Sequence, residues 1–234
     1  MVIKNNDFIE IEYTGKVKDG PIFDTTDEKI AKDNNIYNEK MEFGPIVICV
    51  GEQQVIRGLD KKLIDKELGT YNIELNPEDA FGKKSAKLIQ LISTSKFKQQ
   101  NIEPIPGLQV NIDGIIGIIK TVSGGRTLVD FNHPLAGKNI IYNVKINRII
   151  TDPKEKIISF LKVGLNLKDV EVKVENNKAS IFLKKKFPKE IKDQIIKKLK
   201  ELTKTEIQFK VKTNQNSIKS NNQKKHWKYK YFQD

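Results

Sequence analysis

The sequence predicts an α+β fold divided into several units, and three observations support this. Residues 8–13 alternate apolar and polar side chains, as a half-buried strand does. Residues 54–64 and 188–202 instead place apolar residues at helical spacing. The charge is divided as well: residues 1–150 hold 20 basic and 20 acidic residues, whereas residues 151–234 hold 22 lysines and 10 acidic residues. Because the whole excess of +12 lies in the last third, we expect separate domains with separate partners.

The first part of the chain is predicted to be rich in strands, with one short helix. A continuous β-rich run ends at Gly51, and an alternating segment ends at the turn-like Asn76-Pro77. Residues 17–21 contain an Asp-Gly pair between apolar runs, which is typical of a turn. The polar, aperiodic residues 25–40 are expected to form a loop. The predicted strands are 7–13, 46–50, 71–75 and 140–150, and the predicted helix is 54–64.

Residues 83–131 have a character of their own. The predicted elements are a strand at 88–91, a helical turn at 94–100, and a hairpin around Ser123-Gly124-Gly125 with strands at 109–122 and 126–131. The first hairpin strand has more apolar surface than a small unit needs to bury, through Ile112, Ile115, Ile116, Ile118 and Ile119. Exposed apolar patches mark interaction sites, so we expect this strand to bind a partner.

Residues 151–234 are predicted to form a further α+β unit. Asp152-Pro153 marks its boundary, because the residue before a proline resists the helical conformation. The predicted order is a helix at 154–163, strands at 170–175 and 179–184, a helix at 188–202 that Pro188 opens, and a strand at 206–212. A polar linker is expected at 213–223. Residues 224–232 interleave lysines with aromatic residues, which either pack on their own sheet or stack on nucleic-acid bases.

Several classes of protein are excluded by what the sequence lacks. Its longest apolar runs are about five residues, against ~20 for a transmembrane helix, and no secretory signal is visible. Phosphate-binding, dinucleotide-binding and zinc-protease motifs are missing, and two histidines and one cysteine argue against a metal cluster. We therefore expect a cytoplasmic protein without membrane, metal or cofactor. Cys49 lies in an apolar run, which favours an inert buried thiol over a nucleophile paired with His133.

A series of short motifs runs in order through residues 1–150. The first five are Tyr13-Thr14-Gly15, Phe23-Asp24, Val50-Gly51-Glu52, Val55-Ile56-Arg57-Gly58-Leu59 and Ala80-Phe81-Gly82. With these residues the chain resembles the FKBP-type peptidyl-prolyl cis-trans isomerases. Asn132-His133-Pro134-Leu135-Ala136-Gly137-Lys138 and Tyr142-Asn143-Val144 make it similar to the SlyD-like branch in particular, which includes long archaeal members.

The resemblance implies a fold and a division into domains. It implies an FKBP-type antiparallel sheet wrapped on a short helix, formed by residues 1–82 together with 132–150. The SlyD-like branch carries a chaperone flap between its Ala-Phe/Tyr-Gly and Asn-His-x-Leu-Ala-Gly motifs, and residues 83–131 lie at that junction. Long archaeal members also carry an extra C-terminal domain of about the size of residues 151–234. Many SlyD proteins end in a metal-binding tail, but this tail holds only His226, so no metal site is expected.

The resemblance also implies a pocket for the X–Pro bond. Leu59 would form its floor, Asp24 would accept a hydrogen bond at its rim, and the N–H of Ile56 would hold the substrate carbonyl. Phe81 would close it, in place of the commoner tyrosine. Its walls would be Tyr13, Phe23, Val55, Ile56 and Tyr142, with Ile46, His133 and Leu135 as further substrate contacts. In the flap, the expected contacts with a client protein are Ile115, Ile116, Ile118 and Ile119.

Three hypotheses about function remain open. The first is an isomerase and folding chaperone whose partners are unfolded or nascent polypeptides that contain proline. Such an enzyme needs no cofactor, because rotation about X–Pro must overcome amide resonance, at ~18–20 kcal/mol, without a covalent bond to the protein. The second is a binding module that docks on RNA or the ribosome through the basic residues 151–234. The third assigns those residues to homodimerisation, since a small unit gains stability from a partner's apolar surface.

Overall fold

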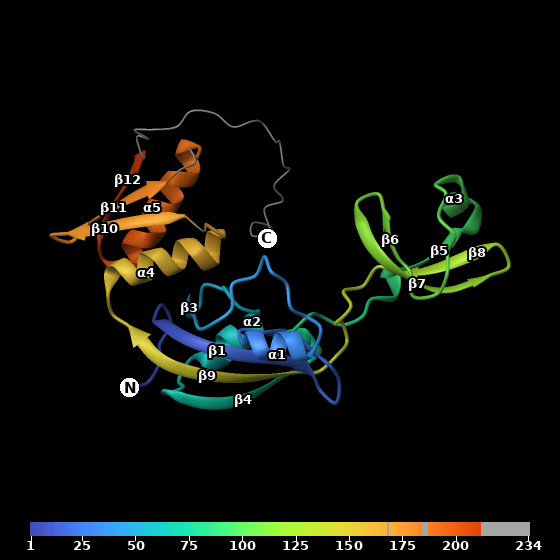
Figure 1. Ribbon diagram of the computed structural model, residues 1–234, viewed down its shortest axis with the longest axis horizontal. Helices are drawn as coiled ribbons and strands as arrows, with labels where there is room; N and C mark the ends of the chain where they lie inside the picture. The colour runs from blue at the N-terminus through green and yellow to red at the C-terminus, as the bar shows by residue number, and fades with distance from the viewer. Residues whose placement is uncertain (168, 184–186, 212–234) are drawn as a thin grey trace.

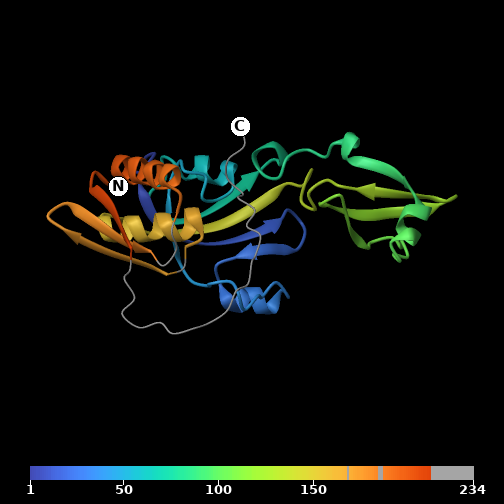
Figure 2. The same cartoon turned by 90° about the horizontal axis from the view of Figure 1, so that it is seen from above.

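The computed structural model describes residues 1–167, 169–183 and 187–211. Within them the strands form three separate sheets. Figure 1 shows the first sheet between the other two, with residues 83–131 at one end of the molecule and the C-terminal unit at the other. The view from above in Figure 2 shows the same arrangement. No helix in the described part of the chain is long and apolar enough to cross a membrane.

The first sheet is antiparallel and is built around β1 (Phe8–Val17) and β9 (Ile140–Ile150), which pair along their whole lengths. The strand order is β2-β1-β9-β4, and β3 pairs with β1 as well. The outer strands are β2 (Ile22–Thr25), β3 (Ile46–Cys49) and β4 (Gly69–Leu75). On this sheet lies α2 (Arg57–Leu63), whose Leu59 and Leu63 are buried in the core. The expected sheet wrapped on a short helix is confirmed.

The expectation of a continuous loop over residues 25–40 is wrong, because α1 (Glu28–Asp33) lies within it. The N-cap of α1 is Asp27, whose side chain accepts a hydrogen bond from the backbone N–H of Ile30 at 2.9 Å. Ala31 is the one buried residue of this helix, so it has no apolar stripe that periodicity could reveal. The capping aspartate followed by an acidic first turn is the signal from which it could have been predicted.

The inserted residues form a four-stranded antiparallel sheet in the order β5-β8-β7-β6. Its elements are β5 (Ile89–Ser93), α3 (Thr94–Gln99), β6 (Gln109–Ile112), β7 (Ile115–Ser123) and β8 (Arg126–Asp130), with short 3-10 turns at Pro77–Asp79 and Ala86–Leu88 before them. The expected hairpin of β7 and β8 is present. The expectation of one strand over 109–122 is wrong, because Asp113 and Gly114 both have positive φ (52° and 86°) and turn the chain between β6 and β7.

The isoleucines of β7 do not share one environment. Ile115 and Ile116 are 59% and 56% exposed, Ile118 is half-buried, and Ile119 is fully buried in the insert's own core. The expectation that Ile119 contacts a client is therefore wrong. Residues of a strand alternate between the two faces of the sheet, and Ile119 occupies the face that the insert uses to fold.

The C-terminal unit has the predicted order of helix, strand, strand, helix and strand. Its elements are α4 (Pro153–Ser159), which continues as a π-helix over Phe160–Gly164, then β10 (Val170–Glu175), β11 (Lys178–Leu183), α5 (Lys189–Thr203) and β12 (Glu206–Val211). Strands β11 and β12 are parallel, which α5 makes possible by crossing between them. The linker predicted at 213–223 and the aromatic and basic segment at 224–232 lie outside the described residues.

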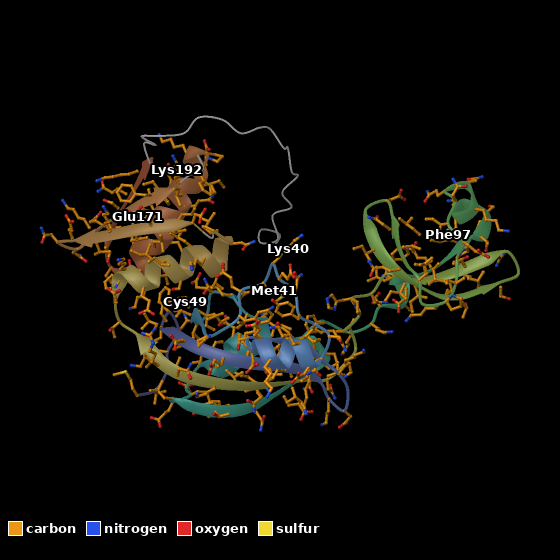
Figure 3. All side chains as sticks on the ribbon, in the orientation of Figure 1. Lys40, Met41, Cys49, Phe97, Glu171 and Lys192 are labelled. Carbon is orange, nitrogen blue, oxygen red and sulfur yellow. The ribbon has the colours of Figure 1, made fainter. Side chains whose placement is uncertain are left out.

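An apolar contact joins the C-terminal unit to the first sheet. Phe8, Cys49 and Ile150, from β1, β3 and β9, form a buried cluster with Leu202 of α5, and Phe160 packs against it. Figure 3 shows Cys49 on the side of the first sheet that faces the C-terminal unit. Since side chains from both parts are buried together in this cluster, the contact is part of the folded core of the chain.

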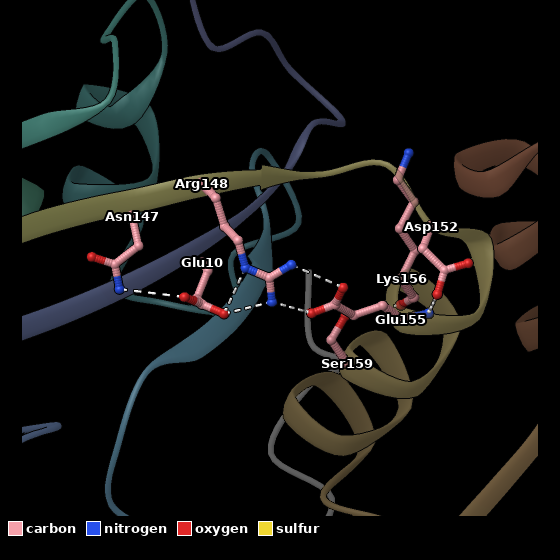
Figure 4. A network of polar contacts seen from close by, with 7 residues as sticks. All are labelled: Glu10, Asn147, Arg148, Asp152, Glu155, Lys156 and Ser159. Atoms are coloured by element: carbon pink, nitrogen blue, oxygen red, sulfur yellow. Dashed lines mark hydrogen bonds and ion pairs between the residues drawn. The ribbon is translucent and has the colours of Figure 1, made fainter.

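A polar network lies beside this apolar contact (Figure 4). The Arg148 guanidinium at the end of β9 donates to Glu10 at 2.7 Å and to Glu155 of α4 at 2.5 Å. Asp152 caps α4 through the backbone N–H groups of Lys154 and Glu155. The network therefore ties the first turn of α4 to both central strands of the first sheet.

Candidate active site

A cavity of about 810 Å³ opens beside the first sheet. Its lining comes from β1, β2, β9 and α2, together with the loops that precede α2, follow β4 and follow β8. The lining residues are Tyr13, Phe23, Asp24, Gln53, Gln54, Val55, Ile56, Arg57, Leu59, Phe81, His133, Pro134, Leu135 and Tyr142. A second hollow of about 760 Å³ runs along α1, but half of its lining residues are charged and it shares only Tyr13 with the first.

Aromatic rings form one wall of the cavity. The Tyr142 ring lies edge-on to Tyr13, at 5.8 Å between centroids, and to Phe23, at 5.9 Å. Phe23 in turn lies edge-on to Phe81 at 5.6 Å, and Phe81 stacks flat on the His133 ring at 4.6 Å. Edge-on and stacked pairs are favourable arrangements of aromatic rings. The rings therefore hold one another in place and leave apolar faces toward the cavity.

Two glycines make this packing possible. A Cβ atom on Gly15 would lie 2.7 Å from the Tyr142 ring and 3.0 Å from the Phe23 ring. A Cβ atom on Gly58 would lie 2.3 Å from the carbonyl oxygen of Asp79. Without a side chain at these positions, the aromatic wall and the first turn of α2 can approach their neighbours closely. The buried Leu59 of α2 is among the residues that line the cavity.

Asp24 is the acidic side chain of the cavity lining. The Tyr13 hydroxyl donates a hydrogen bond to its Oδ2 atom at 3.1 Å. Burial raises the pKa of the Asp24 carboxyl, and the hydrogen bond from Tyr13 partly offsets this effect. Burial also raises the pKa values of Tyr13 and Tyr142, with a further contribution from the Asp24 charge. Both hydroxyls are therefore protonated at neutral pH, and that of Tyr13 donates to Asp24.

The loop before α2 is held by a buried carboxylate. Asp60, which is 3% exposed, accepts hydrogen bonds from the backbone N–H groups of Gly51 and Gln53, each at 2.9 Å. The side chain of Gln54 accepts another from the N–H of Cys49 at 2.7 Å. These bonds fix the loop that presents Val55 and Ile56 to the cavity.

The structure brings most of the predicted site residues together. The eight that the resemblance placed in the pocket all line the cavity, and so do His133 and Leu135. Ile46 is not in the lining and packs instead on the core of the first sheet. The flap isoleucines Ile115, Ile116 and Ile118 lie on β7, outside the cavity. Gln53, Gln54, Arg57 and Pro134 also line the cavity and were not predicted as site residues, although Gln54, Arg57 and Pro134 each adjoin a predicted one.

Metal binding and nucleophilic catalysis by a thiol find little support in the described residues. No group of three or more His, Cys, Asp or Glu side chains there could hold a metal ion. Burial raises the pKa of the Cys49 thiol to about 12. His133 accepts a hydrogen bond from the N–H of Leu135 at its Nδ1 atom. Cys49 is thus a protonated thiol in the contact with the C-terminal unit, whereas His133 lies in the cavity lining.

Comparison with known proteins gives a consistent result. A sequence model of the FKBP-type peptidyl-prolyl cis-trans isomerases matches residues 2–100, and one of the FKBP26 IF domain matches residues 90–135. The chain is 33% identical to the short-type peptidyl-prolyl cis-trans isomerase of Methanocaldococcus jannaschii, over 63% of this chain and 94% of that protein. It is 29% identical to SlyD of Helicobacter pylori, over 54% of this chain and 68% of that protein. An FKBP-type 16 kDa isomerase of Escherichia coli is 27% identical, over 63% and 93%.

The described fold is an antiparallel sheet on a short helix, with a cavity beside it that aromatic rings line. The chain belongs to the FKBP-type peptidyl-prolyl cis-trans isomerases, as its similarity to the archaeal isomerase shows. It is an isomerase that lowers the barrier to rotation about X–Pro bonds.

The replacement Asp24→Asn should change the stability of the protein in a pH-dependent way. Since the folded pKa of Asp24 lies above its unfolded value, this group favours the native state at low pH, and the contribution is lost as pH rises through the folded pKa. Asparagine does not titrate, so the variant should gain stability relative to the parent between about pH 3 and about pH 7. Denaturant unfolding at both pH values measures this. The raised pKa of Asp24 would be contradicted if the difference in stability between variant and parent did not change with pH. It would also be contradicted if that difference shifted in favour of the parent at the higher pH.

Proposed function

We propose that the cavity beside the first sheet is where the isomerase acts, with Tyr13, Phe23, Asp24, Val55, Ile56, Leu59, Phe81 and Tyr142 as the residues that act on the X–Pro bond. One observation carries this proposal. Side chains from β1, β2, β9, α2 and two loops, far apart in the sequence, all line the same cavity. Most of their surface is aromatic or aliphatic, and the polar groups Asp24 and Tyr13 lie side by side.

The chemistry follows from differential binding. A planar amide gains from resonance and is polar, and both properties decrease as the X–Pro bond twists toward its transition state. A dry, apolar cavity stabilises the twisted amide more than the planar one, which lowers the barrier to rotation. The N–H of Ile56, at the start of α2, would hold the substrate carbonyl, while Asp24 would accept a hydrogen bond at the rim. No covalent step and no cofactor is required.

The replacement Phe81→Ala should lower kcat/KM for a short X–Pro peptide by about tenfold or more. Phe81 packs on Phe23 and on His133, so its loss opens the aromatic wall to water. Phe43→Ala is the matched control, because Phe43 stacks on Tyr37 and does not line the cavity. Turnover in a protease-coupled assay, with folding checked by circular dichroism, gives the result. A folded Phe81→Ala protein with the turnover of the parent would disprove the assignment.

The second part of the proposal is that the insert captures client chains. Leu91, Ile115 and Ile116 are 62%, 59% and 56% exposed, although the insert already has a buried core of its own. Strands β5 and β6 are the outer strands of its sheet, and an extended client could add to either edge through backbone hydrogen bonds. Unfolded or nascent polypeptides that contain proline fit such a surface, because backbone pairing makes little demand on sequence. Capture would raise the local concentration of X–Pro bonds at the cavity.

Replacing Leu91, Ile115 and Ile116 together by serine should separate the two activities. The three side chains are exposed, so the insert keeps its buried core and its fold. We expect turnover of a tetrapeptide to stay within about twofold of the parent, and acceleration of proline-limited refolding of a whole protein to fall by about tenfold. Leu68→Ser, at a leucine that is 50% exposed outside the insert, is the control. Refolding catalysis and suppression of aggregation that both survive the triple change would show that the insert does not bind clients.

The third part of the proposal concerns the C-terminal unit, which we assign to homodimerisation. It is a small three-stranded sheet with two helices, and a twofold partner is the commonest way for such a unit to bury more surface. Light scattering of the full chain at micromolar concentration should give twice the monomer mass, and a monomer would overturn the assignment. Docking on RNA is the alternative, and it would appear as binding that weakens steeply with salt.

A further inference from the structure

The loop that precedes α2 lies between two parts of the molecule. On one side Gln53, Gln54, Val55 and Ile56 line the cavity. On the other side the loop meets the C-terminal unit, through α5 and through the π-helix Phe160–Gly164 that lies against β3. We propose that the C-terminal unit positions this cavity loop, with Lys198 and Gly164 as positioning residues for the isomerase reaction. The inference rests on the assignment of the cavity as the active site.

An ion pair makes the first of these contacts. The Lys198 ammonium of α5 lies 2.6 Å from the Glu52 carboxylate, which belongs to the cavity loop. The Glu52 side chain is 17% exposed and that of Lys198 is 37% exposed, so water screens the pair less than a surface pair. Burial lowers the pKa of Lys198, whereas the hydrogen bond and charge of Glu52, together with the charge of Glu201, raise it; the net shift is upward, so the ammonium stays charged. The pair therefore holds the loop three residues before Val55.

The π-helix makes the second contact. A Cβ atom on Gly164 would lie 3.1 Å from Nε2 of Gln54, so the backbone of the π-helix passes directly against this side chain. Nε2 itself is buried and has no hydrogen-bond partner within the described residues. At its other end the same side chain accepts the hydrogen bond from Cys49. Gln54 is thus held between β3 and the π-helix while it lines the cavity, and π-helical turns frequently occur at functional sites.

The rest of the contact keeps these two interactions in place. Val163 of the π-helix packs on the core of the first sheet, and Phe160 packs on the cluster of Phe8, Cys49, Ile150 and Leu202. The C-terminal unit therefore presents Lys198 and Gly164 to the loop from a fixed direction. The isomerase of M. jannaschii is matched over 94% of its length by 63% of this chain. Too little of that protein remains unmatched to form a unit of this size. Support from the C-terminal unit should consequently tune turnover rather than create it.

The experiment uses the full chain and a tetrapeptide substrate too short to need the insert. Lys198→Met removes the ammonium and keeps most of the stem, and we expect kcat and kcat/KM to fall together by about three- to tenfold. The reciprocal exchange Glu52→Lys with Lys198→Glu should restore at least about half of the parent value. Lys200→Met is the control, because Lys200 makes an equally short pair with Glu206 that is 57% exposed and does not touch the loop. The control should turn over like the parent.

Gly164→Ala provides a second, independent variant. Its methyl group would push on Gln54 without creating a charge or a strained φ angle, and we expect a similar fall in kcat. Amide NMR shifts of Val55 and Ile56 report the loop itself. If the shifts change while turnover does not, the assignment of the cavity as active site is wrong. If both shifts and turnover match the parent in Lys198→Met and Gly164→Ala, or if the charge exchange restores nothing, the positioning role is wrong.

Discussion

The antiparallel pairing of β1 with β9 is the interaction on which the rest of the structure depends. It runs from Phe8 opposite Ile150 to Val17 opposite Ile140, and it joins two segments that lie more than a hundred residues apart. Its register places Gly15 opposite Tyr142, where the missing side chain makes room for the tyrosine ring. A slip by one residue would turn the Tyr142 ring to the other face of the sheet and open the aromatic wall of the cavity.

The other two units are attached at the two ends of β9. The insert precedes it, and the side chain of Asn132 joins the two connectors of the insert. Its Nδ2 atom donates to Asp130 at 2.7 Å, and its Oδ1 atom accepts from the backbone N–H of Ser85 at 2.8 Å. The C-terminal unit follows β9 directly, and Arg148 links the end of that strand to α4. Both added units are thus anchored next to β9, the strand that carries Tyr142 of the cavity lining.

The sequence predicted those features that local patterns encode. Alternation in β9 and helical spacing in α5 were sufficient for these elements, and the ordered motifs located the cavity. Helix α1 was missed because its six residues bury one small side chain. The turn at Asp113 was missed because the isoleucines around it suggested one long strand. No local pattern could pair Glu52 with Lys198, since that contact arises only when the C-terminal unit packs against the first sheet.

We propose that one cavity, built by the β1–β9 register, binds the X–Pro bond and catalyses its rotation. Titration of the ¹⁵N-labelled full chain with a short X–Pro peptide tests it most directly, because every backbone amide reports separately. We expect the largest shift changes at Val55, Ile56 and Tyr142, together with exchange between cis and trans peptide that is fast only in the presence of the protein. Shift changes confined to the insert or to the C-terminal unit, with the cavity amides unmoved, would contradict it.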